Sequence, residues 1–390
     1  MNSRLYYRIS IIMMITLIAN SCNKSNRPDS IPIINLDEAT DITVDSIMDK
    51  LEVIPLELGN NHYPSGFNSM WRTNDKIILI DSRNVVFVYT SDGKYLSDST
   101  NKIGNGAGEY SIATAISYNK HSDCIEVATP TQLLFYDFKF NLIKASLLPT
   151  RRPGNGTDGV FFGFIHDISN HEHLLIPESV MEDSRKIMVY DSESGTVIKN
   201  FEYDDYILAD MTMQTNCFHD MPSGEIAFFP PGITNYSFLF NPGTQTLNKQ
   251  HYLDYGEKGI NKSDLGNHYS NLEKLRLEVI SSEKTIPLKT MLCGDNLVIV
   301  LKRGDTLKDF ITFIWNVEIG KGYVLNAYFN EKISFPIIDY SDDSGLYSIV
   351  DSENIGSLTS VISPSKVTIA DSPISEGSIV LIRYVLKSHI

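Results

Sequence analysis

The chain has 390 residues, of which 42% are hydrophobic and 10% aromatic, and its formal net charge is −15. This composition supports a sizeable core and excludes an intrinsically disordered chain. The acidic balance argues against a nucleic-acid partner, because nucleic-acid binding needs a clustered basic surface. The length alone would fit two or three domains, but repetitive all-β folds of this size often form a single unit.

Residues 1–21 have the composition of a signal peptide, so they are set apart from the fold. Arg4 and Arg8 precede the apolar run Ile9–Ala19, which is short for a bilayer span of about 20 residues. The segment ends with small residues directly before Cys22. The same order occurs in the lipobox of bacterial lipoproteins, in which the cysteine receives a diacylglyceryl group. The alternative is an ordinary secretory signal in which Cys22 has no role.

If Cys22 is lipidated, the mature chain begins there and residues 23–30 form a short polar tether. Removal of residues 1–21 takes away two arginines and no acidic residue, so the formal charge changes from −15 to −17. The lipid anchor, and not surface charge, would then hold the protein at the membrane. Some envelope lipoproteins carry a run of acidic residues after the cysteine for export to the cell surface. No such run follows Cys22, so the sequence favours the periplasmic face of the envelope.

Residues 31–390 read as one domain of repeated β-strands. Lys76–Tyr110 shows the pattern of short apolar runs separated by polar turns. One turn contains Asp92 and Gly93, a strong hairpin signal because such turns need positive φ. An aromatic residue at a strand end recurs at Tyr89, Tyr136, Tyr190, Phe240, Trp315 and Tyr384. A period of roughly 50 residues is typical of propeller blades, so we predict an all-β, six-bladed β-propeller of four-stranded antiparallel blades.

Some stretches depart from this period. Residues 261–284 are predicted to form one short helical insertion, residues 59–71 a loop before the first blade, and residues 351–375 an extra polar loop. A strand at Leu51–Leu58, or at Ile31–Ile34, precedes the first blade. We expect it to pair with the last blade and close the ring, because open strand edges invite aggregation.

Four segments resemble the NHL-like, six-bladed β-propeller lipoproteins of the cell envelope: the turn Tyr89–Lys94, the glycine-rich Lys102–Tyr110, the strand Ile54–Glu57 and the lipobox. The likeness covers nearly the whole mature chain and is strongest in residues 51–150. This sequence departs from that family at Ala107, where proline is usual, and at the helix within 261–284. The resemblance implies the propeller fold and an envelope location. It brings no agreed activity and therefore no catalytic residue.

The glycine-rich segment Gly104–Tyr110 is not a phosphate loop, because it lacks the Gly-Lys-Ser/Thr ending and a strand follows it. We favour a structural role, in which the glycines supply positive φ at a crossover between blades and Glu109 binds backbone amides. In the alternative, Glu109 and Tyr110 face a ligand at the rim of the central funnel.

His166 and His219 are each followed by an aspartate, at similar places in the third and fourth blades. Adjacent residues on a strand point in opposite directions, so neither pair forms a dyad by itself. Across blades the side chains could converge on the channel, although a histidine satisfied within a turn is the default. The nearby His171 and His173 are interpreted as part of a solvated hairpin tip and not as metal ligands.

Two other candidates concern ligand contact at loops. Arg151 and Arg152, before the third blade, could bind a carboxylate or a sugar-linked anion, although a solvated loop is the simpler interpretation. Trp71, where the first blade begins, could stack on a sugar, and core packing explains it equally well.

The remaining cysteines, Cys124, Cys217 and Cys293, are odd in number and far apart, so we expect buried, unpaired thiols. No nucleophile elbow or His-Glu-x-x-His motif is present. The sequence therefore favours a binding or scaffold module of the envelope for a glycan, peptide or protein partner. The alternative is a metal-dependent hydrolase or lyase with its site in the central funnel. No cofactor is indicated, calcium or zinc in the channel stays open, and we expect a monomer that meets the membrane only through its lipid anchor.

Overall fold

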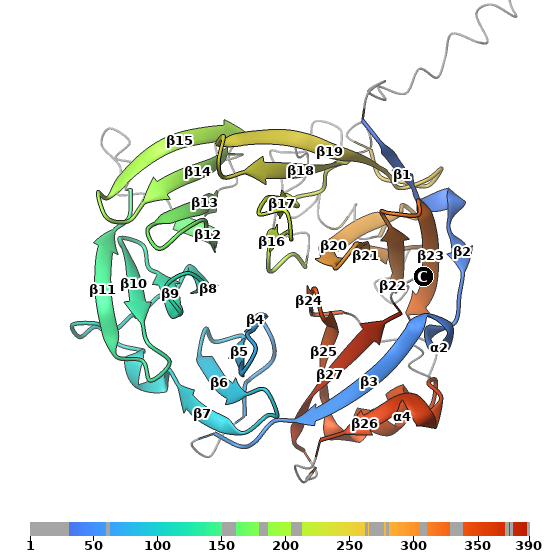
Figure 1. The fold of residues 1–390 in the computed structure, drawn as a ribbon, viewed down its shortest axis with the longest axis horizontal. Coiled ribbons are helices and arrows are strands. Elements are labelled where there is room, and N and C mark those ends of the chain that lie inside the picture. Colours follow the sequence, from blue (N-terminus) through green and yellow to red (C-terminus); the bar gives the residue numbers. More distant parts are fainter. Residues whose placement is uncertain are drawn as a thin grey trace, which may run out of the picture.

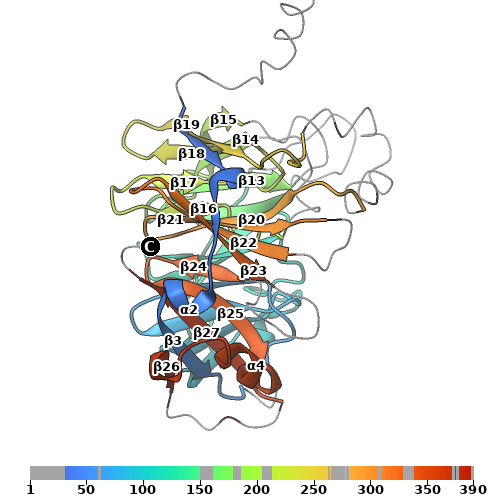
Figure 2. The same cartoon turned by 90° about the vertical axis from the view of Figure 1, so that its right-hand side faces the viewer.

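Six β-sheets surround a central axis, so the fold is a six-bladed β-propeller, as predicted (Figures 1 and 2). The computed structural model describes residues 31–59, 63–149, 161–178, 186–203, 213–261, 264, 277, 281–304, 310–327, 338–370, 374 and 377–387. Most of the helix predicted at 261–284 lies outside these residues. Among the described residues, no helix is long and apolar enough to cross a membrane.

The first three blades follow the chain in order, and each has four antiparallel strands. Blade one contains β4 (Ser69–Arg72), β5 (Lys76–Ile80), β6 (Val86–Thr90) and β7 (Tyr95–Asp98). Blade two contains β8 (Ala115–Asn119), β9 (Cys124–Ala128), β10 (Gln132–Tyr136) and β11 (Leu142–Leu147). Blade three contains β12 (Phe161–Asp167), β13 (Glu172–Glu178), β14 (Lys186–Asp191) and β15 (Thr196–Glu202).

Each of the other three blades has a fifth, parallel strand, which the prediction of four-stranded blades did not include. Blade four contains β16 (Phe218–Asp220), β17 (Ile226–Phe228), β18 (Tyr236–Asn241), β19 (Thr246–Asp254) and the added β1 (Ile33–Asn35). Blade five contains β20 (Ile286–Cys293), β21 (Asn296–Lys302), β22 (Phe310–Asn316), β23 (Lys321–Ala327) and the added β2 (Thr40–Asp41). Blade six contains β24 (Tyr340–Asp342), β25 (Gly345–Asp351), β27 (Ile379–Leu386), β3 (Met48–Pro55) and the added β26 (Val367–Ile369).

The short helices lie in the connections between these strands. Among the described residues, the complete α-helices are α2 (Val44–Ile47) and α4 (Ile355–Thr359). The complete 3-10 helices there are η1 (Leu36–Glu38), η2 (Thr100–Lys102), η7 (Ser352–Asn354) and η8 (Pro364–Lys366). The segment 351–375 is therefore not only a polar loop, because it contains α4 and β26. The loop predicted at 59–71 was also partly wrong, since β4 begins at Ser69.

Residues 33–55, here called the N-terminal strap, run along the outer rim of blades four, five and six in turn (Figure 1). β1 pairs in parallel with β19, β2 pairs in parallel with β23, and β3 pairs antiparallel with β27. Figure 1 shows β2 and α2 on the outside of the ring. The predicted closing strand is confirmed at Met48–Pro55, three residues earlier than expected, whereas the alternative near Ile31–Ile34 joins blade four.

The core consists of six hydrophobic clusters, each between two neighbouring blades. The closing strand β3 contributes to two of them, because alternate side chains of a strand point to opposite faces. Leu51 and Val53 pack against blade five, and Ile54 packs against blade one. The aromatic residues that set the predicted register are all buried. Cys124, Cys217 and Cys293 are buried and form no disulfide among the described residues, as expected.

Candidate functional site

The inner strands of blades two, three and four end on the same face of the propeller, near its central axis. Lys120 and His121 follow β8, His166 and Asp167 end β12, and His219 and Asp220 end β16. We call these six residues the channel-mouth cluster. The sequence shows them as three consecutive polar pairs, one in each repeat, at equivalent ends of equivalent strands. The fold therefore brings together side chains that are about 50 residues apart in the sequence.

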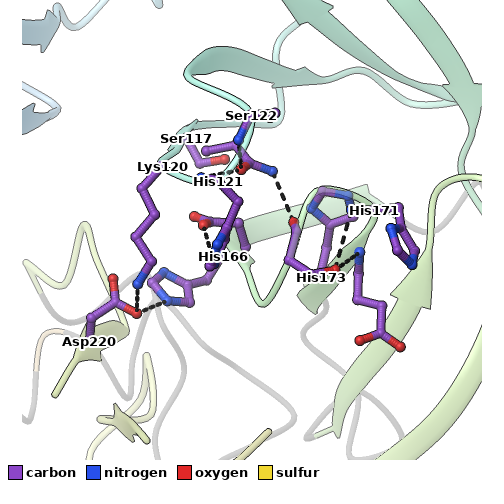
Figure 3. Close-up of polar contacts among 12 residues, drawn as sticks. Ser117, Lys120, His121, Ser122, His166, His171, His173 and Asp220 are labelled. Atoms are coloured by element: carbon purple, nitrogen blue, oxygen red, sulfur yellow. Dashed lines mark hydrogen bonds and ion pairs between the residues drawn. The ribbon is translucent and has the colours of Figure 1, made fainter. Parts of the chain in front are cut away.

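Asp220 is the point at which three blades meet (Figure 3). Its Oδ1 lies 2.6 Å from Nζ of Lys120 and 3.2 Å from Nε2 of His166. The side chains of Lys120 and Asp220 are 43% and 40% exposed, whereas that of His166 is only 10% exposed. Solvent thus reaches both the ammonium and the carboxylate, and a ligand could replace part of this water.

A second contact runs back towards blade two. His121 Nε2 lies 3.4 Å from Oδ2 of the buried Asp167. Because successive side chains of β12 point to opposite sides, Asp167 faces blade two while His166 faces blade four. Oδ2 of Asp167 and Nε2 of His219 are buried and make no hydrogen bond among the residues that the structure describes.

The pairing fixes the protonation of this cluster. Burial alone would raise the pKa of Asp220, but the hydrogen bonds and charges of His166 and Lys120 hold it far below its usual value. Burial alone would lower the pKa of His166, but its hydrogen bond to Asp220 and that carboxylate's charge raise it. Burial, together with the charge of His166, lowers the pKa of His219 to about 3. At neutral pH Asp220 is therefore ionised and His219 is uncharged.

Blades five and six make the same mouth acidic. Burial, followed by the charges of Asp342, Asp220 and Asp295, raises the pKa of Asp343. Arg72, at the end of β4, donates to Ser344 Oγ and Tyr347 OH at 3.2 and 3.0 Å, so it is already engaged. Since carboxylates outnumber cations here, the mouth suits neutral or cationic polar groups better than phosphates.

His173 is not at a solvated hairpin tip, which corrects the interpretation drawn from the sequence. Its side chain is fully buried, with Nδ1 3.3 Å from Oε2 of the equally buried Glu126 and Nε2 3.2 Å from Ser192 Oγ. The order Ser192–His173–Glu126 is that of a nucleophile, a base and an acid. Ser192 is only 5% exposed, so a substrate could not reach its hydroxyl group in this arrangement. We interpret it as a polar contact between blades two and three.

The structure places the other predicted site residues in packing or turn positions. Tyr110 is buried, and its hydroxyl contacts Ser99 Oγ at 2.7 Å. Glu109 Oε2 accepts a hydrogen bond of 2.8 Å from the amide of Gly106. A Cβ at Gly104 or Gly106 would collide with Glu109, and only Gly108 of these glycines has positive φ. Positive φ therefore accounts for Gly108, and Gly104 and Gly106 lie close to the Glu109 carboxylate.

Trp71 lies in β4 opposite Ile78 and packs partly buried against the core between blades one and two. Of the predicted site residues that the structure describes, only His166 and His219 lie in one polar cluster. Arg151, Arg152 and Cys22 lie outside the described residues. Within the described part of the chain, no three His, Cys, Asp or Glu side chains are arranged to hold a metal ion.

Lys120 and His121 were missed from the sequence because they were not aligned with the histidine–aspartate pairs of the next two repeats. Superimposing the ends of the first strand in each repeat places Asn119 at the position of Asp167 and Asp220, with Lys120 and His121 directly after it. The only sequence signal for these two residues is their position in the repeat, because they belong to no local motif.

Comparison with known proteins supports the fold. A family described as a 6-bladed β-propeller matches residues 21–152. A Bacteroides fragilis protein that is thought to be exported is 15% identical, with a TM-score of 0.64 over 89% of this chain and 98% of that one. A member of the DUF4221 family from Bacteroides vulgatus is 13% identical, with a TM-score of 0.57 over 87% and 98%. The chain is a six-bladed β-propeller. No curated protein sequence matches it, and at these identities the structural likeness concerns the fold alone.

Proposed function

We propose that this propeller is a binding module of the bacterial cell envelope, and that its ligand docks at the channel-mouth cluster. The observation that carries the proposal is the convergence of Lys120 and His166, from two blades, on Asp220 of a third. The partly exposed Lys120 and Asp220 offer a donor and an acceptor to a ligand, while the buried His166 keeps the carboxylate in place.

The charge of the mouth indicates the ligand class. Its carboxylates, on Asp220, Asp295, Asp342 and Asp343, favour an ammonium or guanidinium group, and Lys120 can donate to a carbonyl oxygen. A polar segment of a peptide or protein that presents a basic side chain meets both needs. A neutral glycan could form hydrogen bonds with Lys120 and Asp220, but it would not compensate the negative charge of the carboxylates.

The test compares the wild type with Asp220→Asn in titrations against two sets of probes, basic peptides and neutral glycans. Loss of a charged hydrogen bond costs about 1.5–3 kcal/mol, so D220N should weaken peptide binding about tenfold or more. Asp92→Asn is the matched control, because Asp92 pairs with Lys94 in its own exposed turn. Equal peptide binding by wild type and D220N would contradict the proposal, and binding of glycans alone would change the ligand class.

The envelope location is part of this proposal. It is supported by the order of arginines, apolar run, small residues and cysteine in residues 1–22, and by the likeness to a protein that is thought to be exported. We expect Cys22 to carry the lipid anchor, with the propeller facing the periplasm. Cys22→Ser should abolish labelling with a radioactive fatty acid and move the protein from the membrane to the soluble fraction. If C22S stays in the membrane fraction as the wild type does, Cys22 is not the membrane anchor.

The alternative of a metal-dependent hydrolase or lyase calls for one further measurement. Stoichiometric calcium or zinc in the purified protein would favour it. Lys120 and His166 both pair with Asp220 (Figure 3), and His121 pairs with Asp167. We take these pairings as support for a binding site over a metal centre.

A further inference from the structure

Asn119 ends the inner strand of blade two, at the position that Asp167 and Asp220 occupy in blades three and four. It directly precedes Lys120 and His121 of the channel-mouth cluster. These two residues are exposed, whereas Asn119 is fully buried. A buried amide side chain costs free energy unless its donor and acceptor groups are satisfied, so its contacts indicate what it does.

The oxygen of the Asn119 side chain holds the turn that follows β8. Asn119 Oδ1 accepts hydrogen bonds from the backbone amides of His121 and Ser122 at 2.9 and 3.0 Å. An asparagine that binds amides two and three residues ahead fixes the backbone of its turn. Figure 3 shows this turn, from which the side chain of Lys120 extends to Asp220. The place of the Lys120 ammonium therefore depends on a turn that Asn119 closes.

The nitrogen of the same side chain joins this turn to the buried contact between blades two and three. Asn119 Nδ2 donates to Oε1 of the fully buried Glu126 at 2.7 Å and to the backbone carbonyl of Ser169, after β12, at 3.3 Å. Glu126 also accepts a hydrogen bond from Ser117 and contacts His173, so its carboxylate is itself held in place. The Asn119 side chain is thus anchored on two blades.

Asparagine meets both demands at this position. The side chain must accept on the side of the turn and donate on the side of Glu126, and a short amide group supplies both. Aspartate would place a second carboxylate against Glu126. Serine is shorter by one bond, and its single oxygen would have to serve both sides.

We propose that Asn119 is a positioning residue of the channel-mouth cluster, which holds the turn so that Lys120 of blade two reaches Asp220 of blade four. An exposed ion pair gains little when its side chains must first be ordered. A fixed turn removes part of this entropic cost before a ligand arrives. The effect on ligand binding rests on the proposed function, whereas the effect on the turn does not.

The first test needs no ligand and compares Asn119→Ala with the wild type. Hydrogen exchange of the backbone amides of His121 and Ser122 should be about tenfold faster or more in N119A, because both amides lose their acceptor. Asn141→Ala is the matched control, because Asn141 Nδ2 donates to Asp137 at 2.9 Å in another turn of blade two. N141A should leave both exchange rates unchanged. Wild-type exchange rates in N119A would overturn the inference.

A second measurement without ligand follows the lysine. Acetylation of Lys120 by acetic anhydride, detected by mass spectrometry, should be about threefold faster in N119A, because the amine is no longer held at Asp220. Lys94 is the reference within the same molecule, since it pairs with Asp92 in its own turn and should react at an unchanged rate. An equal rate at Lys120 in N119A and the wild type would show that Asn119 does not position this lysine.

The third test uses a basic peptide as the probe. Asn119→Ala and Lys120→Met should each weaken binding about threefold or more, and the double variant should bind about as weakly as the weaker single variant, because both changes remove the same contact. Additive losses would show that Asn119 acts independently of Lys120 and would contradict the proposal. If the wild type binds no basic peptide, the proposed function fails, while exchange and acetylation still decide the role of Asn119.

Thermal unfolding checks the fold of N119A, because a buried asparagine also contributes to stability. If this variant does not fold, the wild type decides. The amides of His121 and Ser122 should then exchange about tenfold more slowly than in an unstructured peptide. Exchange at the unstructured rate would overturn the inference.

Discussion

The channel-mouth cluster shows how one side chain can serve several blades. Asp220 accepts from Lys120 of blade two and contacts His166 of blade three, while it belongs to blade four. Removal of this carboxylate would leave a buried imidazole and a lysine without their partner. The neighbouring His219 is uncharged, whereas Asp220 is ionised, because burial lowers the pKa of the imidazole.

His219 should make the fold sensitive to acid. The unfolded histidine takes up a proton near pH 6.5, whereas the folded one does so only near pH 3. Between these values the unfolded state binds more protons, so the free energy of unfolding falls as the pH is lowered. His219→Phe should flatten this slope by up to about 1.4 kcal/mol per pH unit, measured by urea unfolding between pH 7 and pH 4.

The phenylalanine keeps a ring beside Phe229, which His219 contacts at a centroid distance of 5.5 Å. An acid slope equal to that of the wild type would show that His219 does not titrate as the structure indicates. His166 acts in the other direction. Its raised pKa contributes stability that is complete below the unfolded value and is lost as the pH rises through the folded one.

At the scale of elements, the end of the closing strand fits closely against the first blade. Gly93, in the turn between β6 and β7, has φ of +90° and accepts a hydrogen bond from the amide of Glu57 at 2.9 Å. A Cβ at this position would collide with the carbonyl oxygen of Pro55 at the end of β3. The turn that signals a hairpin in the sequence thus also forms part of the ring closure.

Gly93→Ala should therefore destabilise the fold more than a turn substitution alone. Positive φ costs an alanine about 1–2 kcal/mol, and the collision with Pro55 adds about 1–3 kcal/mol. Gly224→Ala is the matched control, because its φ is +82° and nothing lies within 4 Å of the added carbon. The free energy of unfolding, measured in urea, should be highest for the wild type, lower for G224A and lowest for G93A. An equal loss of stability in the two variants would contradict a tight closure at Gly93.

The sequence predicts the strands of the repeats well, because aromatic residues such as Tyr89 and Tyr136 mark their ends and are buried in the structure. It does not predict β1, β2 and β26, which are two or three residues long and have no periodicity of their own. Their pairing depends on distant partners, and short parallel bridges leave no local signal.

The candidate site is harder to predict for a similar reason. His166 and His219 are visible in the sequence, but their relation depends on which sides of β12 and β16 face each other. His173 is buried against Glu126 of another blade, and the turn residues next to it in the sequence cannot reveal this contact.

At the scale of the whole molecule, the ring is not uniform. Blades four, five and six carry added parallel strands, and in the described residues blades one, two and three end at β7, β11 and β15. Each hydrophobic cluster joins two blades, so no blade has a complete core of its own. Stability therefore depends on closure by β3, which contributes to the two clusters on either side of blade six.

The N-terminal strap also imposes an order on synthesis and on mechanical load. Its residues leave the ribosome before their partners β19, β23 and β27, which end at residues 254, 327 and 386. The strap must therefore wait, unpaired, until each of the last three blades has been made, and the ring seals last. In the finished protein, a pull from the N-terminal side reaches β1 on blade four first. The strands β1 and β2 would have to detach from β19 and β23 before the closing strand β3 came under load.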